Sequence, residues 1–430
     1  MDHINNASPE QQPDHLVQDA TFNDDPPISV PETTPSAFQW DYTQSILTGM
    51  VRQVISSIAA FLTPEILQNS SPNMQPRHST KTAWIQGLRG WLALTVVIMH
   101  LITDVHPRIE LCFGAEIDTE RGLTNTSPIV WPIFRVFFLG GGVAVSLFFF
   151  ISGYIRTRKL FLLLHQNRTG DFMRETAKSI FRRPLRLYMP VIWTNLAVAL
   201  AWHTVGLASP YPVLESTIWQ ELYRWMNETW RFLFFYGDSN MSYNMYTWTI
   251  PIELRGSMLI TCWLLALHHL QTRDRIVATA CFTLYHAFSG TGTKYAPHIA
   301  GMLTAELEIT ISSGSEALMP WIRNLISTIQ RARLQKGLFY AMLVCGLYLG
   351  SQPSAHYLAG DANVSKERVL GTCFGWKILS QLIPSSGDEV DDWRLFWLFW
   401  AGWLLFIAIK ESPVKKLFER RFLQCECISD

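Results

Sequence analysis

The chain has 430 residues, and its 35 basic and 35 acidic residues give a formal net charge of zero. Only 16% of the residues are charged and 48% are hydrophobic, whereas an ordinary soluble protein carries about 25% charged residues. This composition indicates that much of the outer surface faces lipid. The balanced charge argues against a nucleic-acid-binding protein, which would show a basic excess. The seven scattered cysteines include no CxxC pair, which excludes a disulfide scaffold or a zinc module as the organising principle.

Residues 1–78 form a polar segment with nine acids and two bases, and we predict a largely disordered cytosolic tail there. No basic stretch followed by an apolar core opens the chain, so no cleavable signal peptide is expected. Within the tail, apolar residues recur at helical spacing over 45–62 and predict a short amphipathic helix. This helix either lies on the membrane surface or packs on the folded domain.

Residues 79–430 contain the apolar runs from which we predict the fold. Crossing a membrane takes about 20 apolar residues, and the clearest runs of about that length are 84–101, 133–155, 187–208, 248–267 and 393–409. Shorter and more polar candidates are 276–289, 295–311, 337–350 and 369–384. The predicted fold is therefore all-α, a polytopic transmembrane helical bundle with about eight or nine membrane segments.

The charges between these segments predict the orientation. Residues 156–186 carry nine bases and two acids, whereas 102–132 carry five acids and two bases. Residues 209–247 carry four acids and two bases. Since cytosolic loops are rich in Lys and Arg, 156–186 is expected in the cytosol, and the two acidic stretches are expected outside or in a lumen.

Glycosylation motifs agree with this orientation. Asn125, Asn227 and Asn240 head sequons within the two external stretches, and they are candidate glycosylation sites. Nine crossings would place the basic residues from Lys410 to Arg421 outside, so we expect that one of the weak segments does not span.

Arg89 and His100 are ionisable residues inside the first apolar run, where charge is costly and points to function. They are 11 residues apart, so they share one helix face at a separation of roughly 16 Å along the axis. Histidine is well suited to remove a proton from a hydroxyl near neutral pH. The alternative is an arginine that snorkels to the interface and a histidine at headgroup level.

Arginines cluster in the string FRRPLRLYMP, which opens the third apolar run. Arg182, Arg183 and Arg186 are close enough in sequence for two or three of them to meet one anionic group. Guanidinium groups bind phosphate oxygens in pairs, which suits a nucleotide or pantetheine-type carrier. The alternative is ordinary positive flanking of a membrane helix.

Glu253 lies in the string WTIPIELRGS at the start of the fourth strong run. It could orient a base, hold a substrate or neutralise Arg255, which follows two residues later. The glycines of Gly140-Gly-Gly142 and Ser152-Gly153 are expected to allow close helix packing. No metal-ligand spacing, P-loop or dinucleotide fingerprint occurs, so we expect neither a metal nor a tightly bound cofactor.

Four strings in order resemble the acyltransferase 3 family in its fungal style. They are GLRGWLALTVVIMH, GGGVAVSLFFFISGYI, FRRPLRLYMP and WTIPIELRGS, and the resemblance extends over about residues 81–420. One departure is Val143-Ala144-Val145-Ser146, where the family usually has Gly-Val-Asp. The final string KKLFERRFLQCECISD resembles the lead-in to the family's last membrane helices, so the resemblance implies a C-terminal truncation.

The resemblance implies a membrane-bound O-acyltransferase that moves an acyl group, usually acetyl, from acyl-CoA as co-substrate to a hydroxyl. The expected acceptor is a small lipophilic molecule, with secondary-metabolite biosynthesis as one expected setting, and the expected location is an endomembrane such as the endoplasmic reticulum. The alternatives are a polytopic transporter of an anionic metabolite or an inactive truncated remnant. The implied residue roles are His100 as base, Arg89 as its partner, Glu253 as a further catalytic-site residue, and Arg182, Arg183 and Arg186 as donor-binding residues.

Overall fold

The computed structural model describes residues 83–118, 123–205, 215–234, 241–314, 320–331, 334–354, 373, 375–384 and 390–419. The chain divides into the units Met1–Met74 and Gln75–Asp430, and every described residue belongs to the second unit. The predicted amphipathic helix over 45–62 therefore lies outside the described residues.

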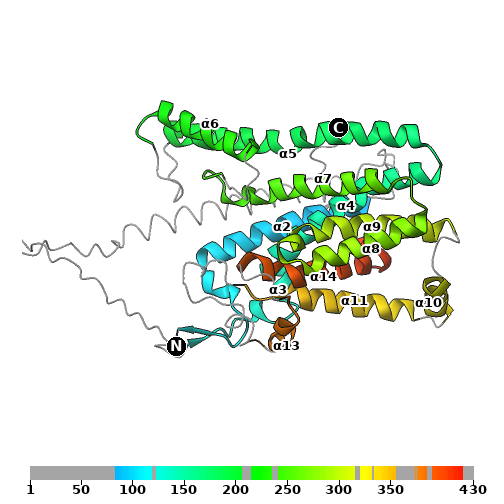
Figure 1. Cartoon of the computed structure of the whole chain (residues 1–430). Helices are drawn as coiled ribbons and strands as arrows, with labels where there is room; N and C mark the ends of the chain where they lie inside the picture. The colour runs from blue at the N-terminus through cyan, green and yellow to red at the C-terminus, as the bar shows by residue number, and fades with distance from the viewer. Residues whose placement is uncertain are drawn as a thin grey trace, which may run out of the picture. The chain divides into compact units, whose positions relative to one another are not determined.

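The described part of the chain is all-α apart from one small ribbon. Strands β1 (Glu116–Asp118) and β2 (Leu123–Thr124) pair antiparallel and form the two-stranded ribbon. Figure 1 shows the long helices of this unit running roughly parallel to one another. The α-helices are α2 (Ala83–Val105), α3 (Arg135–Leu139), α4 (Gly141–His165), α5 (Thr169–Val205), α6 (Ile218–Phe234), α7 (Thr249–Leu267), α8 (Thr272–Phe288), α9 (Ala296–Ser312), α10 (Pro320–Arg331), α11 (Gln335–Gly350), α13 (Trp376–Gln381), α14 (Val390–Glu411) and α15 (Lys415–Phe418). The short 3₁₀ helices are η1 (Pro107–Glu110), η2 (Pro128–Val130), η3 (Met245–Trp248) and η4 (Gly290–Lys294).

Three helical stretches among the described residues are long and apolar enough to cross a membrane. They are Ala83–Val105, Thr169–Val205 and Tyr246–Leu267. Of the weak predicted segment 369–384, the described residues contain only the six-residue helix α13, which is far shorter than the roughly 20 residues that a crossing needs. The number of membrane crossings stays a prediction.

Helix α5 differs from its prediction because it begins at Thr169, well before the apolar run at 187. Its charged first half forms helical ion pairs, such as Arg168 with Asp171 at 2.7 Å and Lys178 with Glu175 at 3.4 Å. Pro184 and Pro190 lie inside the helix, which long membrane helices tolerate when neighbouring groups satisfy the freed backbone. The basic stretch is thus largely helix instead of loop.

The predicted run 133–155 is broken at Gly140, between α3 and α4. The glycines that follow are needed for close approach. A Cβ atom on Gly141 would lie 2.3 Å from the Met99 sulfur of α2, and one on Gly142 would lie 2.7 Å from Leu398 of α14. The expectation that these glycines allow close helix packing is confirmed.

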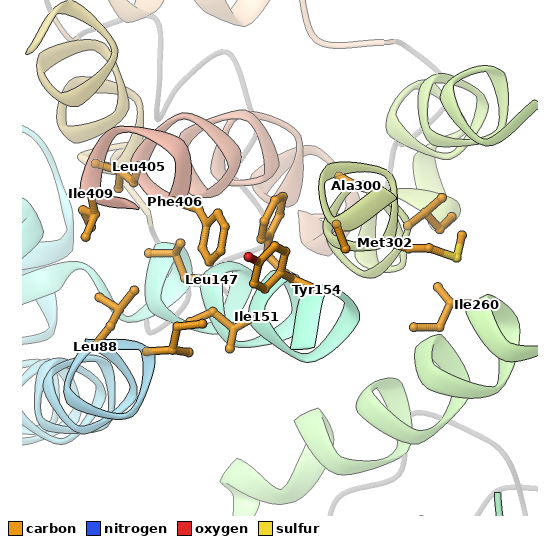
Figure 2. Packing of buried hydrophobic residues seen from close by; sticks show 14 of the residues in the cluster. Leu88, Leu147, Ile151, Tyr154, Ile260, Ala300, Met302, Leu405, Phe406 and Ile409 are labelled. Carbon is orange, nitrogen blue, oxygen red and sulfur yellow. The ribbon is translucent and has the colours of Figure 1, made fainter. Parts of the chain in front are cut away.

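The main hydrophobic core joins helices that are far apart in sequence. Figure 2 shows Leu147 and Ile151 of α4 between Leu88 of α2 and Phe406 of α14. On the other side of α4, Ala300 and Met302 belong to α9 and Ile260 to α7 (Figure 2). Helix α4 contacts α2, α9 and α14, so it is the central helix around which the site residues are arranged.

A disulfide bond links Cys112, after α2, to Cys373, before α13, across 261 residues of sequence. Nearby, Arg135 donates to the carbonyl oxygen of Leu111 at 2.9 Å, and Asn125 Nδ2 donates to the same oxygen at 3.2 Å. The disulfide therefore holds the segment that follows α2 next to the segment that precedes α13. Cysteine spacing did not reveal this pair.

Candidate functional site

Glu253 on α7 is the centre of a polar cluster between four helices. Its Oε2 atom lies 2.9 Å from Nε2 of His298 on α9, and its Oε1 atom pairs with Arg183 on α5. Arg183 also donates to the hydroxyl of Ser152 on α4 at 2.6 Å. We call these four residues, Ser152, Arg183, Glu253 and His298, the Glu253 cluster.

The Glu253 cluster is shielded from solvent. The side chain of His298 is fully buried, and those of Arg183 and Glu253 are 19% and 15% exposed. Because a carboxylate only accepts hydrogen bonds, Nε2 of His298 carries the proton and donates to Glu253. Nδ1 of His298 is buried and has no hydrogen-bond partner among the described residues.

Two glycines and one aromatic ring fix the position of His298. A Cβ atom on Gly256 would lie 2.5 Å from Cε1 and Nδ1 of the His298 ring, and one on Gly153 would lie 2.1 Å from its carbonyl oxygen. Phe149 stacks on the imidazole, with ring centroids 4.8 Å apart. Glu253 and Gly256 are three residues apart on α7 and share a face, so the local sequence brings the carboxylate and the space for the ring together.

Arginines surround this carboxylate. Arg156 on α4 interacts electrostatically with Arg183 and Glu253, and Arg89 on α2 does so with Arg186 and Glu253. Arg156 is half-buried, whereas Arg89 and Arg186 are exposed. We call the four guanidinium groups of Arg89, Arg156, Arg183 and Arg186 the arginine cluster. It places four positive charges around one negative charge.

His100 lies apart from this carboxylate. Its ring packs against Tyr246 of η3, with centroids 3.8 Å apart. Tyr246 and Glu253 are seven positions apart, so the helical rise places His100 on the order of 10 Å from the Glu253 cluster along η3 and α7. The arrangement therefore has an imidazole at one end and a positively charged region at the other.

The chain matches the model of the Acyltransferase domain over residues 82–418, which is most of its length. The chain belongs to the acyltransferase 3 family. The matched domain is a transferase domain. Family membership and the candidate membrane-spanning helices together make the chain an integral membrane protein.

Two fungal relatives resemble the chain at low identity. It is 27% identical over 273 residues to "O-acetyltransferase PaAT-1" of Phomopsis amygdali, and the aligned region covers 56% of this chain and 51% of that protein. It is 24% identical over 282 residues to "Acyltransferase clz18" of Cochliobolus lunatus, and the aligned region covers 55% of this chain and 59% of that protein. The chain thus spans about half the length of the curated relatives it matches. No solved structure matches the chain.

The structure brings together four of the residues predicted from the sequence, namely Arg89, Arg183, Arg186 and Glu253. Arg182 lies on α5 beside Arg183 but is exposed. At the departure from the family pattern, Ser146 is buried, and its hydroxyl has no hydrogen-bond partner among the described residues.

The sequence reasoning missed Ser152, Arg156 and His298 as members of the site. His298 carries a signal that could have found it, since it is an ionisable residue at the start of the apolar stretch 295–311. Arg156 was interpreted only as a basic residue of a cytosolic loop, because the helix that carries it was expected to end at residue 155.

The three glycosylation candidates differ in their surroundings. Asn125 is only 4% exposed and its amide nitrogen is hydrogen-bonded, so a glycan there would require the side chain to leave this position. Asn227 is exposed on α6, and Asn240 lies outside the described residues. Glycosylation stays a prediction at each of them.

Proposed function

We propose that the protein transfers an acyl group, in particular acetyl, from acyl-CoA to a hydroxyl group of a small lipophilic acceptor. The observation that carries this proposal is that the structure has both a histidine on α2, His100, and a separate, strongly positive region beside Glu253. The family match favours an enzyme over the transporter alternative. The names of the two relatives support acyl transfer, and one of them supports acetyl transfer. We also propose that the acceptor belongs to secondary metabolism.

In the proposed reaction, His100 takes the proton from the acceptor hydroxyl. The hydroxyl oxygen then attacks the thioester carbonyl carbon, and the carbon–sulfur bond breaks as the thiolate leaves. The proton that His100 took from the hydroxyl is passed to this thiolate, which restores the neutral imidazole. Arg183 and Arg186, with Arg182 beside them, would bind the phosphates of the donor. Glu253 would fix Arg183, and Arg89 would add positive charge. Holding the two substrates together can supply much of the rate.

We further propose that the protein lies in an endomembrane such as the endoplasmic reticulum. Eight crossings, by α2, α4, α5, α7, α8, α9, α11 and α14, would return the basic residues of α15 to the cytosolic side. The same count would place Cys112 and Cys373 together on the opposite side. Disulfides persist in oxidising compartments such as this lumen, so the observed bond supports both the orientation and the compartment.

The test is the release of free CoA from acetyl-CoA by membranes that contain the protein and a panel of hydroxylated lipophilic acceptors. We expect His100→Ala to lower acceptor-dependent release by about 10²- to 10⁴-fold, the usual contribution of a general base. The matched control is His106→Ala, which removes an exposed histidine just beyond α2. Undiminished release by inserted His100→Ala protein would eliminate His100 as the base.

A further inference from the structure

Arg156 is a member of the arginine cluster whose buried guanidinium group is not explained by its contacts. The terminal nitrogens NH1 and NH2 of its guanidinium group are buried, and neither has a hydrogen-bond partner among the described residues. A buried polar group without a partner costs free energy and needs an explanation. Its nearby charges include Arg183, which repels it, so the arrangement is unfavourable unless an anion is bound.

The neighbours of Arg156 cannot supply that anion in full. Both oxygens of the Glu253 carboxylate are already used, one by Arg183 and one by His298. Ser152, one turn before Arg156 on α4, accepts from Arg183. The single carboxylate therefore leaves most of the positive charge of the cluster unbalanced.

A comparison with the next arginine on α4 shows what an explained position looks like. Arg158 lies 3.7 Å from Glu308, and the same carboxylate also pairs with Lys410 at 2.9 Å. The two arginines are two residues apart and point to different partners, because neighbours at that spacing do not share a helix face. Of these two arginines, Arg156 is the one that interacts with Arg183 and Glu253.

We propose that the arginine cluster is a phosphate-binding site and that Arg156 is a ligand of the phosphate. Arg156 and Arg183 are its partly buried members, and Arg89 and Arg186 are its exposed members. Guanidinium groups donate paired hydrogen bonds to phosphate oxygens, which suits this arrangement. The assignment of the phosphate to the acyl-CoA donor rests on the proposed function. It extends the donor site beyond the arginines of α5 to α4.

The experiment measures binding instead of turnover, with the full chain in detergent. The probes are CoA, inorganic pyrophosphate, pantetheine, which lacks phosphate, and a short-chain phosphatidic acid as a lipid source of phosphate. The apparent affinity is taken from the dependence of the melting temperature on probe concentration. The variants are Arg156→Gln and the matched control Arg158→Gln.

We expect Arg156→Gln to bind CoA and pyrophosphate about 10- to 100-fold more weakly than the wild type, because a charge-assisted hydrogen bond is lost. Pantetheine should bind both proteins equally, and Arg158→Gln should bind CoA as the wild type does. Without ligand, Arg156→Gln should melt no lower than the wild type, since it relieves the repulsion with Arg183.

Three outcomes decide the proposal. Wild-type affinity of Arg156→Gln for both CoA and pyrophosphate would overturn it. Stabilisation by phosphatidic acid but not by CoA would overturn the assignment to the donor. Arg156-dependent CoA binding without any acyl transfer would support the phosphate site and count against the proposed function alone.

Discussion

Two buried ionic sites in this molecule are built in opposite ways. Arg275 on α8 and Glu306 on α9 form a closed pair, with Nε and Oε1 2.5 Å apart and side-chain exposures of 5% and 0%. Arg275 also donates to the carbonyl oxygen of Leu270 at 3.2 Å, and its guanidinium group lies 5.5 Å from the centre of the Phe161 ring. The arginine cluster instead gathers four guanidinium groups around the single carboxylate of Glu253, and two of its members, Arg89 and Arg186, are exposed.

The difference indicates what each site is for. In the Arg275–Glu306 pair one positive charge balances one negative charge, although Oε2 of Glu306 has no hydrogen-bond partner among the described residues. The contribution of such a balanced pair is to the fold. A partly buried surplus of positive charge is unfavourable unless something else balances it. Loss of a charge should therefore reduce stability at the Arg275–Glu306 pair, and ligand binding or rate at the arginine cluster.

The largest expected effect on stability is at the closed pair. Arg275→Ala leaves the Glu306 carboxylate buried without its partner, which should lower the free energy of unfolding by about 3–5 kcal/mol. The measurement is the melting temperature of the protein in detergent. The double variant Arg275→Met, Glu306→Leu should recover most of this loss, because an apolar pair replaces the ionic one. If Arg156→Gln were as destabilising as Arg275→Ala, the contrast between the two sites would fail.

At Gly256 we expect a smaller effect on stability than at Arg275, together with a distinct effect on activity. In Gly256→Ala the new Cβ atom would lie 2.5 Å from the His298 ring, so the ring must move away from Glu253. Overpacking of this kind costs about 1–3 kcal/mol, and we expect acyl transfer to fall by more than the loss of folded protein explains.

The matched control for Gly256 is Gly337 on α11, where an added Cβ atom would meet nothing within 4 Å. Gly337→Ala should be neutral or stabilise the helix by up to about 1 kcal/mol. Equal activity per folded molecule in Gly256→Ala and Gly337→Ala would show that the placement of His298 does not matter for transfer.

The smallest expected effect is a pH dependence at a third ionic site, on α6 outside the membrane-spanning helices. Glu221 accepts from the Tyr243 hydroxyl at 2.6 Å and pairs with Arg224. Burial by itself would raise the pKa of the Glu221 carboxyl. Hydrogen bonds from Tyr243 and Arg224 outweigh this and hold the pKa below its ordinary value of 4.5.

Because the folded-state pKa of Glu221 is lowered, its stabilisation is fully present above the ordinary pKa of 4.5 and is lost as the pH falls below it. Below about pH 5 the melting temperatures of the wild type and Glu221→Gln should therefore converge as the pH falls. A difference that grows on acidification would have the wrong sign.

Much of the candidate site could be predicted because its charges stand out against apolar sequence. Arg89, Arg183 and Glu253 lie in or beside long hydrophobic runs, and the structure brings these three together. Their partners could not be predicted with the same ease, because helix packing decides which faces meet. His298 reaches Glu253 only because Gly256 and Gly153 leave space for it.

The fold was predictable as all-helical, but some helix limits were not. Hydropathy finds apolar residues, so the charged first half of α5 was assigned to a loop although its Arg, Lys, Asp and Glu residues pair along a helix. Similarly, α4 continues past Arg156 to His165. The disulfide was invisible because no local spacing predicts a bond between Cys112 and Cys373, 261 residues apart.

That bond also has a consequence for biosynthesis. Ribosomes deliver the chain from its N-terminus at about 5–20 residues per second. The 261 residues between the two cysteines therefore impose a delay of roughly 13 to 50 s before Cys373 can follow Cys112 out of the ribosome. During that interval Cys112 cannot yet form its bond with Cys373. Closure of the correct bond would then mark molecules in which the helices between the two cysteines have been delivered.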